Sequence, residues 1–302
     1  MAYAACDMSE PTSDAARADL ARQVDAAQSI LDTPAAAQAR RLEWAQARLC
    51  RHVAEAMARL APASGAGALV RDSGCAIFAG AGSPLTQGMA MGLAGVVSAA
   101  ELDAFEAHLA PQGGPRQLEL SPFADASLTA LLAERRYRVH EWQLVWTRDL
   151  STVADATPTP PAAGEVQVRP LAPGQEDLFL RVLLAGFLES EEVPPEAMAL
   201  LRPTAFAAGY ELYLAFIGDE PVGGGTLAYT DGVALIAGSG VRPAYRRRGA
   251  QGALLRTRLT RARELGCDLA ASSTLPGTAS RRNMERHGFT VAYPKLLMLR
   301  DG

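Results

Sequence analysis

The chain of 302 residues contains two similar halves, and this repetition limits the folds that it can adopt. A constant shift of 152 positions aligns six pairs of identical or similar residues: Ser121 with Ser273, Tyr137 with Phe289, Val139 with Val291, Leu144 with Leu296, Arg148 with Arg300, and Asp149 with Asp301. A repeat of this length is too long for a solenoid. It therefore predicts two copies of one α/β domain.

Hydrophobic spacing predicts the elements of the first half. Apolar residues recur at helical spacing within residues 13–60, with a break at Pro34. Strands follow from Ala68, and the uncharged residues 80–100 are interrupted by Gly, Ser, Thr, Gln and Pro, which favours paired strands over a membrane span. The other expected elements are a helix at Ala99–Leu109, a strand at Gln117–Leu120, a helix at Ser127–Glu134, and two strands within Tyr137–Arg148.

The second half repeats this order after a linker. Residues 151–165 are rich in Ser, Thr, Pro and Ala and show no periodicity, as linkers do. Beyond them we expect strands at 166–171, 211–218, 221–230, 233–241 and 268–273, helices at 176–187, 195–206 and 249–265, and a short helix with two strands at the end. The predicted fold is α/β with a mixed sheet, and the predicted domains are residues 1–150 and 166–302.

Charge and cysteine content argue against several classes of function. The formal net charge is −4, and no region forms a basic stripe with interleaved aromatic residues, so a nucleic-acid partner is not expected. Lys295 is the only lysine. The four cysteines, Cys6, Cys50, Cys75 and Cys267, are scattered, with no CxxC pair and no nearby pair of histidines. This pattern indicates reduced thiols and no bound metal.

The first residues of the chain carry no secretory signal. The segment MAYAACDMSEPTSD has neither a basic region nor an apolar core. Since no membrane span is expected either, we predict a cytoplasmic protein that does not bind membranes.

The residues that carry chemistry are concentrated in Arg246–Gly252, which reads RRRGAQG. An apolar strand runs into a turn at Pro243, then into this loop, then into a helix. Such a loop places several backbone N–H groups at a helix N-terminus, where the helix dipole favours an anion. Gly249 and Gly252 would let a phosphate approach the backbone, and the arginines add positive charge. The alternative is a surface cluster of arginines before an amphipathic helix.

This loop resembles motif A of the GNAT superfamily of N-acetyltransferases, which reads Arg/Gln-x-x-Gly-x-Gly/Ala. Arg246 matches the first position and Gly249 the fourth; Gln251 occupies the sixth, where the family has Gly or Ala, and Gly252 follows. Residues 280–289, SRRNMERHGF, resemble motif B, which ends in a Gly-Phe before the next strand. The chain is therefore identified as two tandem GNAT-like domains.

The resemblance implies an acetyl-CoA site in the second half. The strand before motif A would bond the pantetheine arm through its backbone and polarise the thioester carbonyl through an N–H group. Motif B would cover the ADP side of CoA, with Ser280 and Asn283 as polar contacts. Ser280 could instead be a helix N-cap, and Asn283 could face solvent. The predicted cofactor-binding residues are Ser239, Gly240, Val241, Arg246, Arg247, Arg248, Gly249, Ala250, Gln251, Gly252, Ser280 and Asn283.

The catalytic groups depart from the family pattern. The family's general acid is usually a Tyr four residues before the motif B glycine, and Met284 occupies that position here. Tyr293 lies just beyond and is the candidate for protonating the departing thiolate; the alternative is a structural tyrosine in a buried strand. No single residue stands out as the general base that would accept the proton of the amine. Carboxylates in segments that edge the family's acceptor cleft are Asp231, Glu211 and Glu189.

The first half lacks the cofactor loop. Residues 93–103 stand where motif A would fall, and they contain no arginine and no second glycine. Ser98 and Glu101 instead form a capping-box pattern, which satisfies the helix N–H groups that a pyrophosphate needs. Glu101 and Asp103 would also repel a pyrophosphate. We therefore expect a degenerate first copy that covers a partner face or lines the acceptor cleft, as the second subunit does in GNAT dimers.

These features predict an acetyl-CoA-dependent N-acetyltransferase that acts on a primary amine of a small molecule, as a monomer or homodimer. A protein or peptide acetyltransferase is the alternative among enzymes, and a non-catalytic acyl-CoA-binding module is the alternative outside them. The sequence does not name the acceptor, because the segments expected to form its pocket, Glu189–Phe206 and Tyr229–Gly232, carry no recognisable motif.

Overall fold

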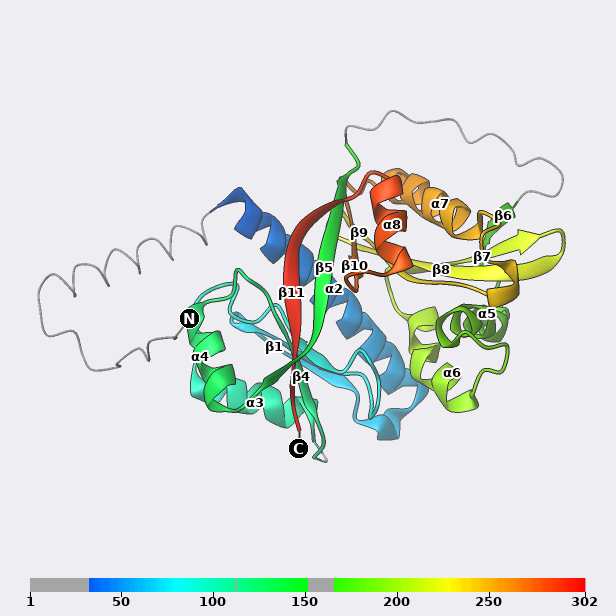
Figure 1. Ribbon diagram of the computed structural model, residues 1–302. Coiled ribbons are helices and arrows are strands. Elements are labelled where there is room, and N and C mark those ends of the chain that lie inside the picture. The colour runs from blue at the N-terminus through cyan, green and yellow to red at the C-terminus, as the bar shows by residue number, and fades with distance from the viewer. Residues whose placement is uncertain (1–32, 112, 152–165, 302) are drawn as a thin grey trace, which may run out of the picture.

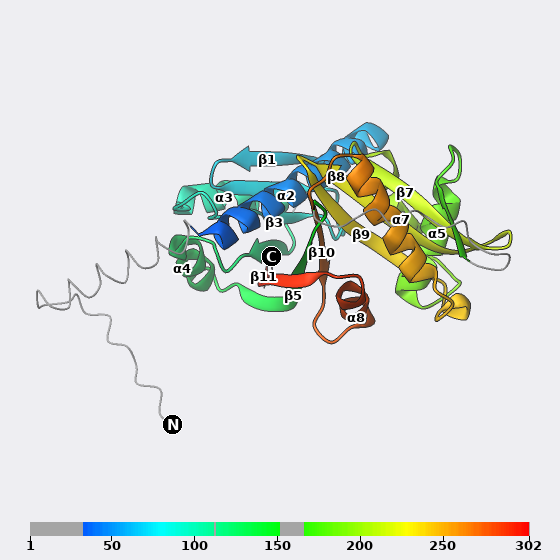
Figure 2. The ribbon, with the colours of Figure 1, turned by 90° about the horizontal axis from the view of Figure 1, so that it is seen from above.

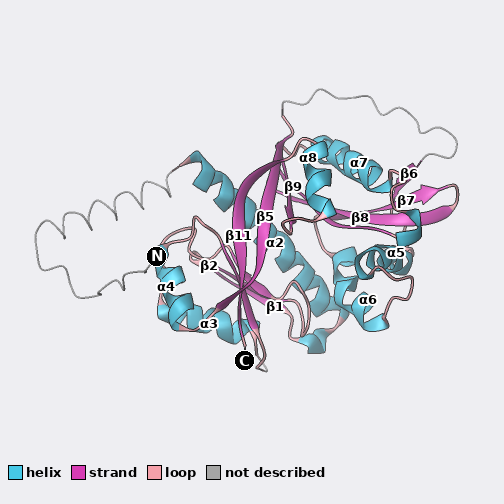
Figure 3. Cartoon of the chain, in the orientation of Figure 1, coloured by secondary structure: helices cyan, strands magenta, loops and turns pink. Residues whose placement is uncertain are grey.

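The computed structural model describes residues 33–111, 113–151 and 166–301. In this part of the chain, a single mixed sheet of eleven strands runs through both halves (Figures 1 and 3). Its strand order is β1-β2-β3-β4-β11-β5-β10-β9-β8-β7-β6. The helix expected before Pro34, Cys6 and the linker from residue 152 onward lie outside the described residues.

The first half begins with a long helix. Thr33 caps its N-terminus, since the Thr33 hydroxyl accepts a hydrogen bond from the Ala36 N–H at 3.2 Å, and Pro34 suits the first helical position. The paired strands expected over residues 80–100 reduce to three strand residues. The chain turns on either side of them, where Gly80 and Gly92 adopt positive φ angles. The elements are α2 (Pro34–Leu60), a 3-10 turn (Pro62–Ser64), β1 (Gly67–Arg71), β2 (Gly74–Phe78), β3 (Gln87–Met89), α3 (Ala99–Leu109), β4 (Arg116–Leu120), α4 (Ala126–Glu134) and β5 (Arg138–Asp149).

The second half follows the order expected from its sequence up to its last strand. Its elements are β6 (Val166–Pro170), α5 (Glu176–Leu188), α6 (Pro195–Leu201) with a 3-10 turn (Arg202–Phe206), β7 (Tyr210–Ile217), β8 (Glu220–Thr230), β9 (Val233–Val241), a 3-10 turn (Pro243–Tyr245), α7 (Ala250–Glu264), β10 (Leu269–Thr274), α8 (Ala279–Arg286) and β11 (Thr290–Arg300).

The two halves exchange their last strands. β11 lies between β4 and β5, and β5 lies between β11 and β10. Figures 1 and 2 show β5 and β11 side by side at the centre of the molecule. The sequence pattern predicts two strands at each of these ends, and this prediction is wrong. Each end is one long strand because it pairs with its counterpart from the other half, so no hairpin is needed to continue the sheet.

Helices cover both faces of the sheet. On one face, α2 packs on β2, β3, β10 and β11, and α5 with α6 packs on β7. On the opposite face, α3 and α4 pack on the strands of the first half, and α7 and α8 on those of the second. Because α2 touches strands from both halves, it joins them together with the exchanged strands.

The repeat in the sequence is also a repeat of structure. The shift of 152 positions places α4 on residues 278–286, and α8 spans Ala279–Arg286. It places β5 on residues 290–301, and β11 spans Thr290–Arg300. The duplication predicted from the sequence is therefore confirmed at the level of the fold.

Candidate active site

The strands β9 and β10 diverge in the middle of the second half. They pair in parallel only where Val233–Leu235 meets Leu269–Ala271. Just beyond these pairs, the Ser272 hydroxyl donates a hydrogen bond to the Ile236 carbonyl oxygen at 2.9 Å. On its other edge β9 stays paired with β8 as far as Val241. Within the described residues, the β10-facing edge of β9 beyond Ile236 therefore has no strand partner.

A β-bulge shapes this open stretch of β9. Gly224 of β8 pairs with Gly240, and Thr226 pairs with Ala237, so that β9 carries one residue more than β8 between these pairs. Gly238 within the bulge has a φ angle of 48°, which glycine adopts without strain. A bulge redirects the backbone groups beside it. Of the predicted contacts, Ser239 lies in this bulge, and Gly240 and Val241 follow it.

Helix α5 lies directly against the same stretch. A Cβ atom on Gly240 would come within 2.4 Å of the Leu183 carbonyl oxygen. A Cβ atom on Gly186 would come within 2.5 Å of the Val241 backbone nitrogen. Both positions therefore require glycine for the close approach of helix and strand, and this packing closes the α5 side of β9.

The loop after β9 presents a bare helix N-terminus. Gly249 is the N-cap of α7, with a φ angle of 87° and no side chain to bond the first N–H groups. Gly249 is exposed, and a Cβ atom there would meet nothing within 4 Å. The first N–H groups of a helix lack partners within the helix and favour an anion. The geometry thus fits a phosphate, as the sequence predicts.

The arginines of the loop divide between two environments. Arg246 donates to the Glu189 carboxylate at 3.0 Å and to the Gly186 carbonyl oxygen at 3.1 Å, so it ties the loop to the end of α5. The guanidinium of Arg248 lies 5.5 Å from the centre of the Tyr245 ring. Arg247 and Arg248 are both exposed and remain available to a phosphate group.

Helix α8 packs against the first turn of α7. A Cβ atom on Gly252 would lie 3.6 Å from Nε2 of His287, and His287 is held by a 2.8 Å contact between its Nδ1 and the Asn283 carbonyl oxygen. Gly252 therefore also serves helix packing. Thr278 is the N-cap of α8. The alternative that Ser280 caps this helix is wrong, and Ser280 lies exposed in its first turn.

One arginine that the sequence analysis did not select reaches the bulge from α7. Arg258 is fully buried and bonds the carbonyl oxygens of Thr226 and Ala237 and the hydroxyl of Ser239. In sequence it sits beside Leu255 and Leu259 on the apolar face of α7, where a charge is unusual. A charged residue on the apolar face of a predicted helix is therefore the sequence signal that could have singled out Arg258.

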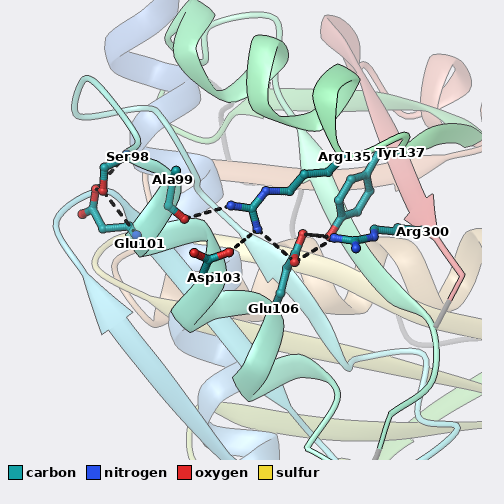
Figure 4. A network of polar contacts seen from close by, with 8 residues as sticks. All are labelled: Ser98, Ala99, Glu101, Asp103, Glu106, Arg135, Tyr137 and Arg300. Atoms are coloured by element: carbon teal, nitrogen blue, oxygen red, sulfur yellow. Dashed lines mark hydrogen bonds and ion pairs between the residues drawn. The ribbon is translucent and has the colours of Figure 1, made fainter.

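The N-terminus of α3 in the first half is capped by the chain's own side chains (Figure 4). The Ser98 hydroxyl accepts from the Glu101 N–H, and the Glu101 carboxylate accepts from the Ser98 N–H, so the predicted capping box is present. The strands β3 and β4 meet at Gly88 and Leu118. A Cβ atom on Gly88 would lie 2.2 Å from the Leu118 side chain and 2.6 Å from that of Met91. The side chains of Leu118 and Met91 therefore fill the space beside Gly88.

The comparison with protein families matches the region built above. The model of the Acetyltransferase (GNAT) family matches residues 179–289, which run from α5 through the diverging strands and the glycine loop to the end of α8. These residues form a GNAT acetyltransferase domain.

Solved structures share the fold of the GNAT domain and extend the likeness to the first half. A GCN5-related N-acetyltransferase from Kribbella flavida is 18% identical, with a TM-score of 0.57, over 85% of this chain and 95% of that one. A GNAT-family acetyltransferase from Novosphingobium aromaticivorans is 17% identical, with a TM-score of 0.51, over 78% and 91% of the two chains. A tandem GNAT protein from the clavulanic acid biosynthesis pathway is 14% identical, with a TM-score of 0.51, over 67% and 70%. No curated protein matches the chain.

The GNAT domain carries a buried methionine where the family has its tyrosine. Met284 is 4% exposed and packs in the core under α7. Tyr293 is also buried, and its hydroxyl donates to the Glu43 carboxylate of α2 at 2.7 Å. Burial, and next the negative charge of Glu43, raise the pKa of Tyr293 well above its ordinary value. Tyr293 therefore has the environment of a structural tyrosine, and its hydroxyl proton is already donated.

The three carboxylates considered as bases are all engaged in ion pairs. Glu189 pairs with Arg246, and Asp231 pairs with Arg48 of α2. Glu211 accepts from Arg261 and from the hydroxyl of Tyr213, and the hydrogen bond from Arg261 lowers its pKa. A lowered pKa makes a carboxylate a weaker base, so Glu211 is poorly suited to accept the proton of an amine.

Other features of the described residues lie away from the opening. A hollow of about 620 Å³ is lined by residues that include Arg148, Thr290 and Ala292 and sits by the start of β10, where β10 and β9 are still paired. No group of three metal-ligating side chains occurs in residues 33–111, 113–151 and 166–301. None of the helices in these ranges is long and apolar enough to cross a membrane. Cys50, Cys75 and Cys267 are free thiols.

Proposed function

We propose that the chain is an acetyl-CoA-dependent N-acetyltransferase with one cofactor site, in the second half. The observation that carries this proposal is the open edge of β9 that leads into the uncapped N-terminus of α7 at Gly249. Backbone N–H and C=O groups along that edge suit an amide-rich arm, and the helix N-terminus suits its pyrophosphate. Both features lie within the residues that match the family.

The chain's own residues would hold the cofactor at three places. The backbone of Ser239, Gly240 and Val241 would bond the pantetheine arm, and residues 246–252 would surround the pyrophosphate. Ser280 and Asn283 of α8 would contact the ADP side. Bound acetyl-CoA supplies the activated acetyl group. Protein atoms would orient it. No described side chain is assigned as general acid, so solvent can protonate the leaving thiolate.

A small amine is the acceptor that the surroundings favour. Helix α2 of the first half lies across segments expected to form the acceptor pocket. Arg48 pairs with Asp231 at the β8–β9 turn, and Arg59 donates to the Phe206 carbonyl oxygen after α6. These contacts support a small acceptor, because they hold α2 of the first half against the segments expected to form the acceptor pocket. The proposed division is therefore a covering domain at 1–150, a linker at 151–165 and a catalytic domain at 166–302.

A panel of acceptors tests the proposal. Purified protein is mixed with acetyl-CoA and with primary amines, peptides or folded proteins, and the free thiol of released CoA is followed. Transfer to small amines supports the proposal, and transfer only to peptides or proteins would favour the alternative enzyme. Tight acetyl-CoA binding with no transfer to any amine would favour an acyl-CoA-binding module.

A further inference from the structure

Arg258 is a buried cation without an anionic partner. Its side chain is fully buried, and no described carboxylate forms an ion pair with it. It bonds the Leu254 carbonyl oxygen of its own helix at 3.0 Å and two carbonyl oxygens of the sheet, those of Thr226 and Ala237, each at 2.9 Å. Burial lowers its pKa to about 9, still above neutrality, so the guanidinium is charged at pH 7.

The strands around the bulge are built to accept this side chain. A Cβ atom on Gly225 of β8 would lie 3.0 Å from Cζ of Arg258, so glycine makes the room that the guanidinium occupies. An uncompensated buried charge is costly, and a well-packed apolar side chain is commonly as stable or more so. Stability alone is therefore a weak reason for an arginine here, and perturbed charges of this kind are common at functional sites.

The fourth partner of Arg258 is the Ser239 hydroxyl, and this contact indicates a role for Arg258 at the opening between β9 and β10. Nη2 of Arg258 donates to the Ser239 hydroxyl oxygen at 2.5 Å. Because Ser239 accepts from Arg258, its own proton must be directed elsewhere, and the described residues offer that proton no acceptor. Ser239 is only partly buried and lies on the stretch of β9 that β10 leaves open. Ser239 therefore carries a donor that no described residue uses, on the stretch of β9 beside the opening.

We propose that Ser239, held by Arg258, donates a hydrogen bond to the carbonyl oxygen of the bound acyl group. This inference rests on the proposed function, and it makes Ser239 a catalytic residue and Arg258 a positioning residue. During transfer, negative charge develops on that oxygen, and a preorganised donor backed by a buried cation stabilises such charge strongly. The hydroxyl would act beside the backbone N–H groups of β9.

The first half supplies an independent argument. In the sequence alone, the shift of 152 positions sets Glu106 against Arg258 and Gln87 against Ser239. Glu106 binds Arg135, Tyr137 and Arg300, all within the first half or the exchanged strand β11. The half that has lost its ligand site has also lost this pair.

The test is the infrared carbonyl stretch of bound acetyl-CoA labelled with a heavy carbon isotope at the acetyl carbonyl. In the wild-type protein we expect this stretch to move to lower frequency on binding, because a hydrogen bond weakens the C=O bond. Ser239→Ala should lose most of that shift and retain acetyl-CoA affinity, whereas Ser239→Thr, which keeps the hydroxyl, should restore it. Turnover of Ser239→Ala should fall by roughly 10²–10³-fold.

Ser272→Ala is the matched control. Ser272 also lies where the strands diverge, but its proton is already donated to the Ile236 carbonyl oxygen, so its removal should leave the carbonyl frequency unchanged. Arg258→Met should reduce the shift even though Ser239 is present. If Arg258→Met does not fold, Arg258→Lys serves, since a shorter ammonium group keeps a charge but does not reach all four partners.

Each outcome separates the inference from the proposed function. A folded Ser239→Ala protein whose bound carbonyl matches wild type would overturn the role of Ser239. A folded Arg258 variant with the full shift would overturn the role of Arg258. A Ser239-dependent shift in a protein that transfers acetyl to no amine would support the inference and refute the proposed function.

Discussion

The N-termini of α3 and α7 occupy equivalent places in the two halves and present opposite surfaces. At α7 the N-cap is Gly249, exposed and without a capping side chain. In the first half the N-cap of α3 is Ser98, which forms the capping box with Glu101, and the shift of 152 positions matches Gly249 with the residue before it, Val97. Val97 is buried, and its N–H is bonded to the Ser127 hydroxyl at 2.9 Å. The same backbone arrangement is open to an anion in one half and satisfied by the chain itself in the other.

The strands beside these two helices also differ in the space that they leave between them. β9 and β10 diverge after three pairs, whereas Leu118 of β4 fills the space over Gly88 of β3. The comparison teaches that a few side chains decide whether this fold holds a ligand. On the proposed function, a glycine N-cap and an open strand edge suit a cofactor, whereas a capping box at the same helix end does not. The predictions below test that contrast.

The largest expected effect comes from placing the residue of the first half in the second. Gly249→Val should abolish acetyl-CoA binding, measured by calorimetry, because a branched side chain would project where a phosphate must approach. The control is Gly266→Val: Gly266 has a φ angle of 76° and, like Gly249, open space around an added Cβ atom. Both variants carry similar backbone strain, of order 1–3 kcal/mol. Equal losses of binding in both would show that strain, and not the site, is responsible.

The counterpart of Arg258 should matter for stability alone. Glu106→Ala leaves Arg135, Arg300 and Tyr137 without their shared carboxylate (Figure 4) and should lower the free energy of unfolding by about 3 kcal/mol. Acetyl-CoA affinity of the folded protein should not change. Asp103→Ala, which removes an exposed partner of Arg135, should cost less than about 1 kcal/mol. Weaker acetyl-CoA binding in Glu106→Ala would mean that the first half takes part in the cofactor site.

The exchanged strands place a buried charged cluster between the halves. Lys295 of β11 donates to Glu43 and Gln46 of α2 and to Glu119 of β4. Burial raises the pKa of Glu119 to about 7. The positive charge of Lys295 opposes this rise, and the negative charge of Glu43 adds to it. The counterpart of Lys295 on β5 is Gln143, which is only partly buried, so the duplicated strands differ here too.

This cluster predicts a pH dependence of stability. The folded protein holds a proton on Glu119 up to about pH 7, whereas an unfolded glutamate loses it near pH 4.3. The stabilisation from that proton is complete below the unfolded pKa and is lost as the pH rises through 7. Urea unfolding at pH 5 and pH 8 should therefore show a drop of order 2 kcal/mol in wild type that Glu119→Gln lacks. An identical drop in both proteins would exclude Glu119 as its source.

The smallest effect is expected at Tyr293. Tyr293→Phe removes one buried hydrogen bond to Glu43 and should lower the free energy of unfolding by about 1 kcal/mol, with turnover nearly unchanged. A fall in turnover of roughly 10²-fold at unchanged acetyl-CoA affinity would instead make Tyr293 the general acid.

The sequence predicts well those features that depend on neighbouring residues, such as helix bounds and helix caps. The bounds of α3 and the capping box at Ser98 follow from neighbouring residue types, and so does the glycine N-cap at Gly249. Contacts between distant segments could not be predicted in this way. The strand pattern of β5 and β11 does not name a partner, so their exchange was missed. The Tyr293 hydroxyl bonds Glu43, which lies 250 residues earlier in the chain. The contacts of Arg258 with Gly225 and with the bulge of β9 appear only once the chain is folded.

The central claim is that one half binds the cofactor and the other has lost the site, and the stoichiometry of acetyl-CoA binding tests it most directly. Titration calorimetry on the full chain should give close to one acetyl-CoA per chain, and Gly249→Val should remove all of that heat. Two equivalent sites per chain, or a single site that survives Gly249→Val in a folded protein, would contradict the account.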